Sequence, residues 1–477
     1  MNSFSRNTMY SLLNQFITVS IPLITFPYIS RVLGPENYGA VNFAISIVTL
    51  FAIFGGIGLV GYATREIAKY RDNIEKLSKT FLELFLIQLL LTICVFVIYL
   101  FFIFFSKEVN TNLNLFLIVG FTLFTNLFTF HWFFMGIEDF KYITTRDAFV
   151  KVFFVILIFS FINDKNDNVL YVFLNLTSLI LSALLNCGFL IKKIKIKPYN
   201  LVFRHHLKPV TLALIMSFIS TLTIQLNSVL LGSIAAKENL GYYNVGLKLA
   251  TMIVNIISSG LLVMLPRLSY LNSIDDTNGQ VNIMKKTSSV LMFFSIPASI
   301  GLFLYSKQII LLLFGENYIS AIIVSQITAI CLIIMPLTGI LYNYIYSNNK
   351  EHLAIITMII SLIVSILINF LLVPQFLFIG AAISFVVVEL VKLIIYIFFI
   401  KRLKKEMSIY SHRYIKYIVI STFTLVVPYL VINPSNVLMT TISMALSVCS
   451  YCLLFLILRD PLCLALFNGL KTKLSKG

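Results

Sequence analysis

The sequence predicts an all-α protein that crosses a membrane about fourteen times. Of its 477 residues, 59% are hydrophobic and only 12% are charged, whereas soluble domains carry about 25% charged residues. The apolar residues form continuous runs, which differ from the alternating pattern of β-barrel strands. Fourteen spanning helices of about 20 residues need roughly 280 residues, and the hydrophobic content is large enough to supply them.

Fourteen apolar runs are long enough to be spans. They cover residues 10–33, 40–63, 80–105, 113–137, 142–162, 169–191, 207–232, 241–265, 287–306, 318–346, 353–373, 378–400, 414–432 and 437–458. The longest gaps, at 192–206 and 266–286, leave no room for a soluble domain. The first run contains Pro22 and Pro27 and has no small-residue cleavage site after it. We therefore interpret it as a retained helix and not as a secretion signal.

The basic residues are distributed unevenly along the chain, whose net charge is +17. With the N-terminus inside, 28 of the 36 Lys and Arg residues fall in inside segments and four in outside loops. This bias predicts that both termini are cytoplasmic. Attraction between these basic segments and anionic membrane lipids explains the net charge, so we expect no nucleic-acid partner.

A short polar phrase occurs twice, 202 positions apart. Residues 31–43 read RVLGPENYGAVNF and residues 235–245 read AAKENLGYYNV, so Glu, Asn, Gly and Asn recur with one spacing. Each copy follows an outside loop and begins a span. We interpret the phrase as the mark of two six-helix bundles of matching topology, as in transporters that bind substrate between repeats. Chance similarity in an apolar chain is the alternative.

The repeat also suggests domain boundaries. We predict an N-terminal six-helix bundle at residues 1–200 and a C-terminal six-helix bundle at residues 201–402. Residues 403–477 would then form two further transmembrane helices and a cytoplasmic tail.

Polar side chains follow one face of the second, seventh and eighth spans, at steps of three, four or seven residues. Serine, threonine and glycine often pack membrane helices together, which is the simpler interpretation for them. Asparagine, glutamine and lysine cost more to bury, and they favour a water-filled cavity. We predict that six uncharged residues of these faces bind substrate: Asn42, Thr49, Gln225, Asn244, Thr251 and Asn255.

Four basic residues lie within spans: Arg31, Lys151, Lys248 and Lys392. Inserting such a charge at the centre of a membrane helix costs about 2.5–3.5 kcal/mol, so each residue needs a partner or a function that offsets this cost. Lys392 has Glu389 three residues before it, and Lys151 has Asp147 one turn before it, so either can be an ion pair. Arg31 lies near a helix end and can extend to the surface. Lys248 has no acid within one turn and is the best candidate for an anionic substrate, although an acid on another helix is an alternative.

No enzyme motif or metal-binding pattern is present in the sequence. It contains no P-loop and no G-x-S-x-G motif, and Cys449 and Cys452 have no second pair to complete a zinc site. We therefore predict no catalytic residue, no metal site and no cofactor. We expect His205 and His206 to be solvated in a basic loop, and His131 to be a packing residue, with proton transfer as its alternative.

Longer stretches of the chain resemble a known family. FPYISRVLGPENYGAVNFAISIV at residues 26–48 and GLVGYATREIAKYR at residues 58–71 resemble the start of the Wzx-type flippases of polysaccharide repeat units. These O-antigen and capsule exporters belong to the multidrug/oligosaccharidyl-lipid/polysaccharide exporter superfamily. LLFGENYISA at residues 312–321 and LIVSILINFLLVPQFLFIGAAIS at residues 362–384 resemble later phrases of the family.

The resemblance implies two six-helix bundles around a central cavity in the bacterial cytoplasmic (inner) membrane. It implies an undecaprenyl-diphosphate-linked oligosaccharide as substrate, moved from the inner to the outer leaflet, with a polymerase and chain-length machinery as possible partners. It places the first, second, seventh and eighth helices at the cavity and makes the last two helices accessory. Arg31 matches the arginine of the family's opening motif, whereas Lys151 and Lys248 are candidates from this sequence alone.

Two other functions fit part of the pattern. A multidrug antiporter of the same superfamily should have an acidic cavity, but the in-span charges here are mostly basic. A polysaccharide polymerase or ligase is also a polytopic protein that acts on lipid-linked sugars, but such enzymes generally have a large outside loop. Proton or sodium coupling is left open by the sequence.

Overall fold

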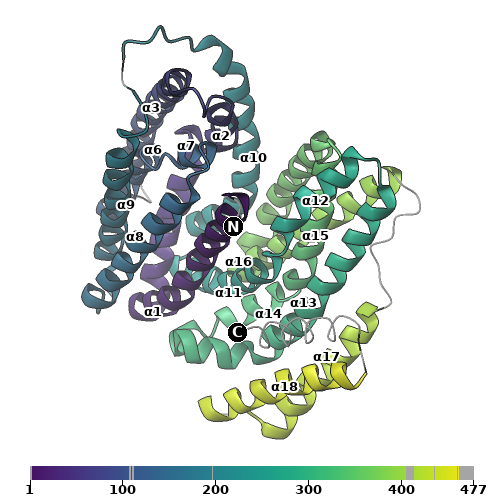
Figure 1. Ribbon diagram of the computed structural model, residues 1–477. Helices are drawn as coiled ribbons and strands as arrows, with labels where there is room; N and C mark the ends of the chain where they lie inside the picture. The colour runs from purple at the N-terminus through teal and green to yellow at the C-terminus, as the bar shows by residue number, and fades with distance from the viewer. Residues whose placement is uncertain are drawn as a thin grey trace. The chain divides into compact units, whose positions relative to one another are not determined.

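The computed structural model describes residues 3–106, 109, 112–195, 197–403, 413–434, 436–458 and 460. These residues are almost entirely helical and contain no strand, which confirms the predicted all-α class (Figure 1). The helices are α1 (Ser3–Phe54), α2 (Val60–Lys69), α3 (Ile74–Phe105), α5 (Leu113–Gly120), α6 (Thr122–Leu127), α7 (His131–Gly136), α8 (Phe140–Phe161), α9 (Asn168–Leu190), α10 (Arg204–Ile234), α11 (Lys237–Ser258), α12 (Leu261–Ser273), α13 (Thr277–Phe314), α14 (Ala321–Thr328), α15 (Cys331–Ser347), α16 (Glu351–Leu403), α17 (Arg413–Ile432) and α18 (Val437–Ile457). Two short 3₁₀ turns, η1 (Ile57–Leu59) and η2 (Glu316–Tyr318), precede α2 and α14.

Ten helices in the described residues are long and apolar enough to cross a membrane, or eleven if the bent pair α14 and α15 is one span. α1 and α16 each cover two predicted spans, and α8, which carries four charged residues, covers another. The predicted count of fourteen therefore stays a prediction.

Two of the long helices contain a break whose cause is visible in the sequence. In α1 the break lies at Gly34, with φ 72° and ψ 171°, a conformation that favours glycine. The next residue is Pro35, which lacks a backbone N–H and so cannot complete the hydrogen-bond ladder. In α16 the break lies at Leu377, whose φ is 49°, three residues after Pro374.

The chain forms two compact units. Unit 1 comprises Met1–Asn244 and Ser365–Ala381, and unit 2 comprises Val245–Val364 and Ala382–Gly477. In unit 1, α1 packs against α8 and α10, α2 against α7, and α9 against α5 and α8. In unit 2, α13 packs against α14, α15 and α17, and α17 lies along α18 (Figure 1). The domain boundaries at 200 and 402 remain predictions, and the predicted tail after residue 460 lies outside the described residues.

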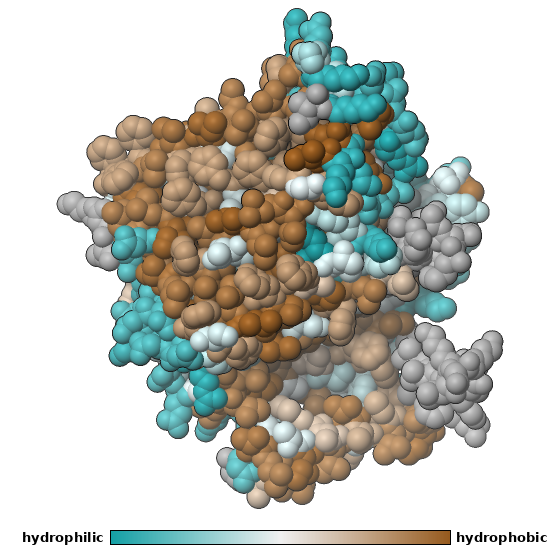
Figure 2. All heavy atoms as spheres, turned by 60° about the vertical axis from the view of Figure 1, so that its left-hand side comes forward, coloured by the Kyte–Doolittle hydropathy of each residue, from teal (hydrophilic) through white to brown (hydrophobic). Residues whose placement is uncertain are grey.

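Large apolar side chains are exposed on many of the helices. Phe105, Phe16 and Val431 are exposed by 81%, 70% and 78%, and apolar residues cover most of the face seen in Figure 2. A surface of this extent is unfavourable in water and matches the acyl chains of a bilayer. The protein is therefore a multi-pass membrane protein, as its composition predicts.

Candidate substrate-binding site

The two copies of the repeated phrase lie directly against each other in unit 1. A Cβ atom on Gly39 would come within 1.8 Å of the carbonyl oxygen of Lys237. A Cβ atom on Gly241 would come within 2.1 Å of the carbonyl oxygen of Pro35. Each glycine thus faces backbone at the start of the other copy. Because both neighbours are backbone, only a residue without a side chain fits at either position.

The packing around this contact is equally close. The Lys237 ammonium lies 3.7 Å from the centroid of the Phe43 ring and donates a hydrogen bond to the carbonyl oxygen of Gly232. A Cβ atom on Gly232 would meet the Phe43 ring at 2.2 Å. α1, α10 and the start of α11 are therefore held together by glycines at this end of unit 1.

The polar faces after the two copies make matching hydrogen bonds. Asn42 and Thr49 each donate to the carbonyl oxygen four residues earlier, at 2.7 Å. Asn244 and Thr251, which are 202 positions further on, do the same at 3.0 Å. Many Thr side chains of this protein make the same bond to the carbonyl four residues earlier, such as Thr64 and Thr223, so the true repeat stays a prediction.

The predicted site residues fall into both units. Arg31, Asn42, Thr49, Lys151, Gln225 and Asn244 lie in unit 1, and Lys248, Thr251 and Asn255 lie in unit 2. Three of the nine are exposed: Arg31, Lys248 and Asn255. The rest are half-buried. All nine lie on helices, but their roles in substrate binding remain predictions.

The in-span charges differ in their partners. Lys392 binds the Glu389 carboxylate at 2.7 Å, which is the ion pair that their spacing predicts. Lys151 instead donates to the hydroxyl of Thr18 on α1 at 2.6 Å. Asp147, the alternative partner of Lys151, forms its close ion pair with the neighbouring arginine at 2.5 Å, and its pairing with Lys151 stays a prediction. No ion pair in the described residues involves Arg31.

That arginine, Arg146, is a residue that sequence reasoning placed wrongly. We counted it among the 28 basic residues of inside segments, although it falls in the predicted span 142–162; it lies within α8 and only 7% of it is exposed. Its Nη1 donates to the Asn186 side chain at 2.6 Å, and the Asn186 amide donates to the carbonyl oxygens of Phe128 and Thr129 at 3.1 and 2.7 Å. These carbonyls are freed where α6 ends and Phe130 takes a φ of 44°. Asn186 thus supplies hydrogen bonds to backbone carbonyls that the broken helix leaves without a partner. A membrane protein tolerates such a break only where the backbone is buried in protein or lines a cavity.

A second buried polar cluster was also missed. The Asn227 amide on α10 donates to the hydroxyl of Tyr243 at 2.9 Å and to the carbonyl oxygen of Ala381 at 3.1 Å. Asn369 on α16 donates to the Asn227 side-chain oxygen at 2.6 Å. These contacts join three helices of unit 1. The signal was present, because an asparagine in an apolar run is costly to bury without partners.

A cavity in unit 1 has a partly polar lining that includes the predicted site residue Thr49. It has a volume of about 300 Å³ and is formed by α1, α5, α6 and α9. Its polar side chains are Thr49, Thr122, Asn126, Tyr171 and Asn175. Hydroxyl and amide groups of this kind can exchange hydrogen bonds with the hydroxyls of a sugar.

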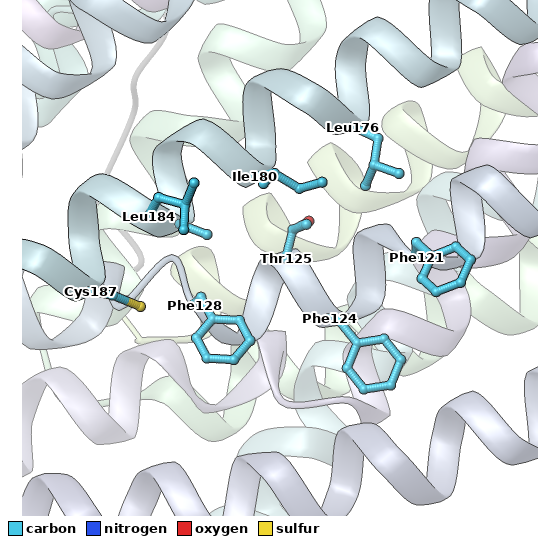
Figure 3. A pocket seen from close by; sticks show the side chains of 9 residues that line it. Phe121, Phe124, Thr125, Phe128, Leu176, Ile180, Leu184 and Cys187 are labelled. Carbon is cyan, nitrogen blue, oxygen red and sulfur yellow. The ribbon is translucent and has the colours of Figure 1, made fainter.

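A second hollow in unit 1 is apolar. Its volume is about 360 Å³, and it lies between α6 and α9 (Figure 3). Rings from the α6 side and aliphatic side chains of α9 line it, namely Phe121, Phe124, Phe128, Leu176, Ile180 and Leu184. Thr125 and Cys187 complete the wall. Such a surface suits a hydrocarbon chain and offers almost nothing to a polar ligand.

Known proteins resemble this chain over most of its length. Residues 4–272 match the model of the family described as "Polysaccharide biosynthesis protein". The "Putative O-antigen transporter" of Escherichia coli (strain K12) is 24% identical over 393 residues, which are 81% of this chain and 94% of that protein. The "Succinoglycan biosynthesis transport protein ExoT" of Rhizobium meliloti (strain 1021) is 29% identical over 93 residues, about a fifth of each chain.

Solved structures show the same fold at low sequence identity. A "Lipid II flippase MurJ, inward closed conformation" has a TM-score of 0.75 and is 14% identical, with 96% of this chain and 99% of that chain covered. An inward-facing multidrug resistance MATE family transporter has a TM-score of 0.62 and is also 14% identical, with 84% and 96% covered.

The family match spans more than half of the chain, and the fold is shared with a lipid II flippase and a MATE family transporter. This confirms the resemblance that the opening motif predicts. The chain belongs to the polysaccharide biosynthesis protein family, and it is a membrane transporter involved in polysaccharide biosynthesis.

Proposed function

We propose that this protein is a flippase for undecaprenyl-diphosphate-linked oligosaccharide repeat units. It would move them from the inner to the outer leaflet of the bacterial cytoplasmic membrane by alternating access. The observation that carries the proposal is the similarity to an O-antigen transporter over 81% of the chain. The proposal is also supported by the fold, because one solved structure with this fold is a lipid II flippase.

The charge of the in-span residues supports an anionic substrate. Arg31 and Lys248 are basic, exposed and set in helices otherwise rich in apolar residues. A guanidinium presents paired donors to phosphate oxygens, and an ammonium acts as a point charge. We propose that these two residues attract the diphosphate, with Lys151 as a third cation that first has to leave Thr18.

Uncharged polar residues would bind the sugars. Asn42, Gln225, Asn244 and Asn255 offer amide groups, and Thr49 and Thr251 offer hydroxyls, which suit sugar hydroxyls in number and kind. Thr49 already lines the polar cavity of unit 1. The apolar hollow beside α9 can accommodate part of the lipid tail while the rest stays in the bilayer.

We propose that an ion gradient supplies the energy for transport. Transport against a gradient needs coupling, and protons or sodium ions are the candidates, with no bound cofactor. Glu389 is a carboxylate deep within a span, but its ion pair with Lys392 gives it a structural reason to be there.

The alternative functions are less well supported. A multidrug antiporter for cationic compounds would need acidic residues where Arg31 and Lys248 stand. A polymerase or ligase would need catalytic groups, and the compared relatives are named as transporters, not enzymes. We therefore propose that the protein performs no chemical reaction, and that a polymerase and chain-length machinery act on the units it exports.

The fate of the lipid-linked unit in cells lacking this gene tests the proposal. An impermeant sugar-oxidising label would report which leaflet holds it. Single units that stay protected from the label support a flippase. Single units that are labelled but unpolymerised would mean that translocation survives, and would point to the polymerase function.

The same assay tests the diphosphate contact. We expect Lys248→Ala to reduce export more than Lys392→Ala at matched protein levels, because Lys392 is already neutralised by Glu389. Export by Lys248→Ala equal to that of the parent would rule out this role for Lys248.

A further inference from the structure

Three metal-ligating side chains meet at one end of unit 1, and none of them is a predicted substrate residue. Glu83 lies on α3, and His205 and His206 lie in the first turn of α10. Their ligand atoms all lie within 4.8 Å of one another. His206 is fully buried, which contradicts the solvated histidine that the sequence predicts. Glu83 is also buried, whereas the His205 side chain is 54% exposed.

We propose that Glu83, His205 and His206 form a binding site for one divalent transition metal ion of the zinc class. Glu83 Oε2 lies 3.3 Å from His206 Nε2 and 3.9 Å from His205 Nε2. Two ligands about 2.0–2.1 Å from a tetrahedral zinc lie about 3.3 Å apart, so the first distance already fits. The exposed His205 ring now lies over the His206 ring, with centroids 3.8 Å apart, so it has to swing away from that ring to bring its Nε2 into range. Two imidazoles and one carboxylate are a donor set that zinc accepts, with water in the fourth position.

The groups behind these ligands orient them for a metal. The Nδ1 atom of His206 lies 2.7 Å from the hydroxyl of Tyr62, a contact that fixes the ring and leaves Nε2 facing Glu83. The other carboxylate oxygen of Glu83, Oε1, accepts the backbone N–H of Val202 at 2.7 Å. Oε2 is thereby the oxygen that faces both imidazoles. Partners of this kind, one step behind the ligands, are typical of metal sites.

The charges around the cluster allow a cation to bind. Lys79 is a cation beside the cluster, and its ammonium lies 3.9 Å from Glu83 Oε1, whereas the imidazoles face the other oxygen, Oε2. Glu66 adds negative charge near Tyr62 and His206. Neutral imidazoles bind the metal, so affinity should fall when the histidines are protonated at low pH.

The site lies where the chain passes from α9 to α10. Along this passage, the backbone N–H of Lys195 donates to Ser78 at 2.9 Å and Lys197 binds Glu75 at 3.1 Å, so the connection already follows α3. A metal held by Glu83 and the two histidines would fasten the start of α10 to α3 and α2. The ion would therefore stabilise unit 1 whatever the protein transports.

The test uses the full-length protein in detergent, without a polyhistidine tag, after treatment with a chelator. We expect one Co²⁺ ion per chain with the visible absorption of a tetrahedral site, displaced by one Zn²⁺ ion. His205→Ala should raise the Kd for Zn²⁺ at least tenfold, as should Glu83→Gln, because each removes a ligand. Tyr62→Phe should raise the Kd by about tenfold, because loss of an outer partner typically costs 10–100-fold in affinity.

Matched controls come from the same chain. His352→Ala removes an exposed histidine on α16, and Glu75→Gln removes an exposed acid on α3; both should leave the Kd unchanged. Because His205 is half exposed, its variant should fold, and an unchanged Tm without metal would establish this. Zn²⁺ should raise the Tm of the parent but not that of His205→Ala. Absence of stoichiometric binding in the parent, or an unchanged Kd in His205→Ala, would overturn the proposal and leave the cluster as a hydrogen-bond network.

Discussion

The contact between the two copies of the repeated phrase can be broken by a single methyl group. In Gly39→Ala the new Cβ would start 1.8 Å from the carbonyl oxygen of Lys237. Real Cβ atoms essentially never come closer than 3.0 Å to such an atom, so the two backbones must separate by about 1.2 Å. No side-chain rotation can relieve the contact, because the carbonyl belongs to the backbone.

The expected magnitude follows from two opposing terms. Alanine in a helix interior is favoured over glycine by roughly 0.5–1 kcal/mol. Overpacking of a well-packed core costs about 1–3 kcal/mol, and contacts with rigid backbone fall at the upper end. We therefore expect Gly39→Ala to lower the free energy of unfolding of unit 1 by about 1–2 kcal/mol. Gly241→Ala should behave alike, because its Cβ would meet the carbonyl oxygen of Pro35 at 2.1 Å.

The control is a glycine in another helix of the same unit. A Cβ atom on Gly188, within α9, would have no neighbour within 4 Å, so Gly188→Ala should be neutral or stabilising. The single tryptophan of the chain, Trp132, is buried in α7 of unit 1, and its fluorescence reports thermal unfolding in detergent. We expect the Tm of Gly39→Ala to fall below that of the parent and of Gly188→Ala. Equal Tm values for the two variants would refute the reasoning that the copies are in backbone contact.

Three further substitutions test buried polar contacts by thermal unfolding. Asn186→Leu should cost about 2–4 kcal/mol, because it leaves Arg146 and two backbone carbonyls without their partner. Glu389→Gln should lower the free energy of unfolding by roughly 3 kcal/mol, because it leaves the largely buried Lys392 without its carboxylate. Adding Lys392→Met should recover part of this loss. Strictly additive effects of the two substitutions would contradict the coupling between them. Tyr305→Phe should cost about 1 kcal/mol by removing a 2.6 Å hydrogen bond between α13 and α18, and an unchanged Tm would argue against that bond.

The apolar runs of the sequence were sufficient to predict the all-α class and the helices, because both depend on a local property of the chain. A continuous apolar run has one stable outcome in a bilayer, a helix whose backbone bonds are satisfied internally. The break at Gly34-Pro35 is local in the same sense, since it depends on the chemistry of two adjacent residues. The number of separate spans stays a prediction, because α1 and α16 each contain two helical segments joined at a break.

The partners of buried polar groups were not readable, because they come from distant parts of the chain. Arg146 and Asn186 are 40 positions apart, and Glu83 and His206 are 123 positions apart. A pattern within one helix predicted the Glu389–Lys392 pair, where both members lie on one turn. For Lys151 the same rule named Asp147, but the close ion pair of that carboxylate is with the neighbouring Arg146.

The partners of the in-span cations bear on which of them meet a substrate. A cation that is buried and paired, such as Arg146 or Lys392, has its cost of insertion offset by the protein itself, and removing it should chiefly affect stability. An exposed cation such as Arg31 contributes little to stability, so its retention in an apolar helix needs another reason. Neutralising Arg31 should therefore leave the Tm unchanged and reduce export, whereas the reverse result would assign it a structural role. This separation of stability from export is the sharpest criterion that the structure offers for the substrate-binding residues.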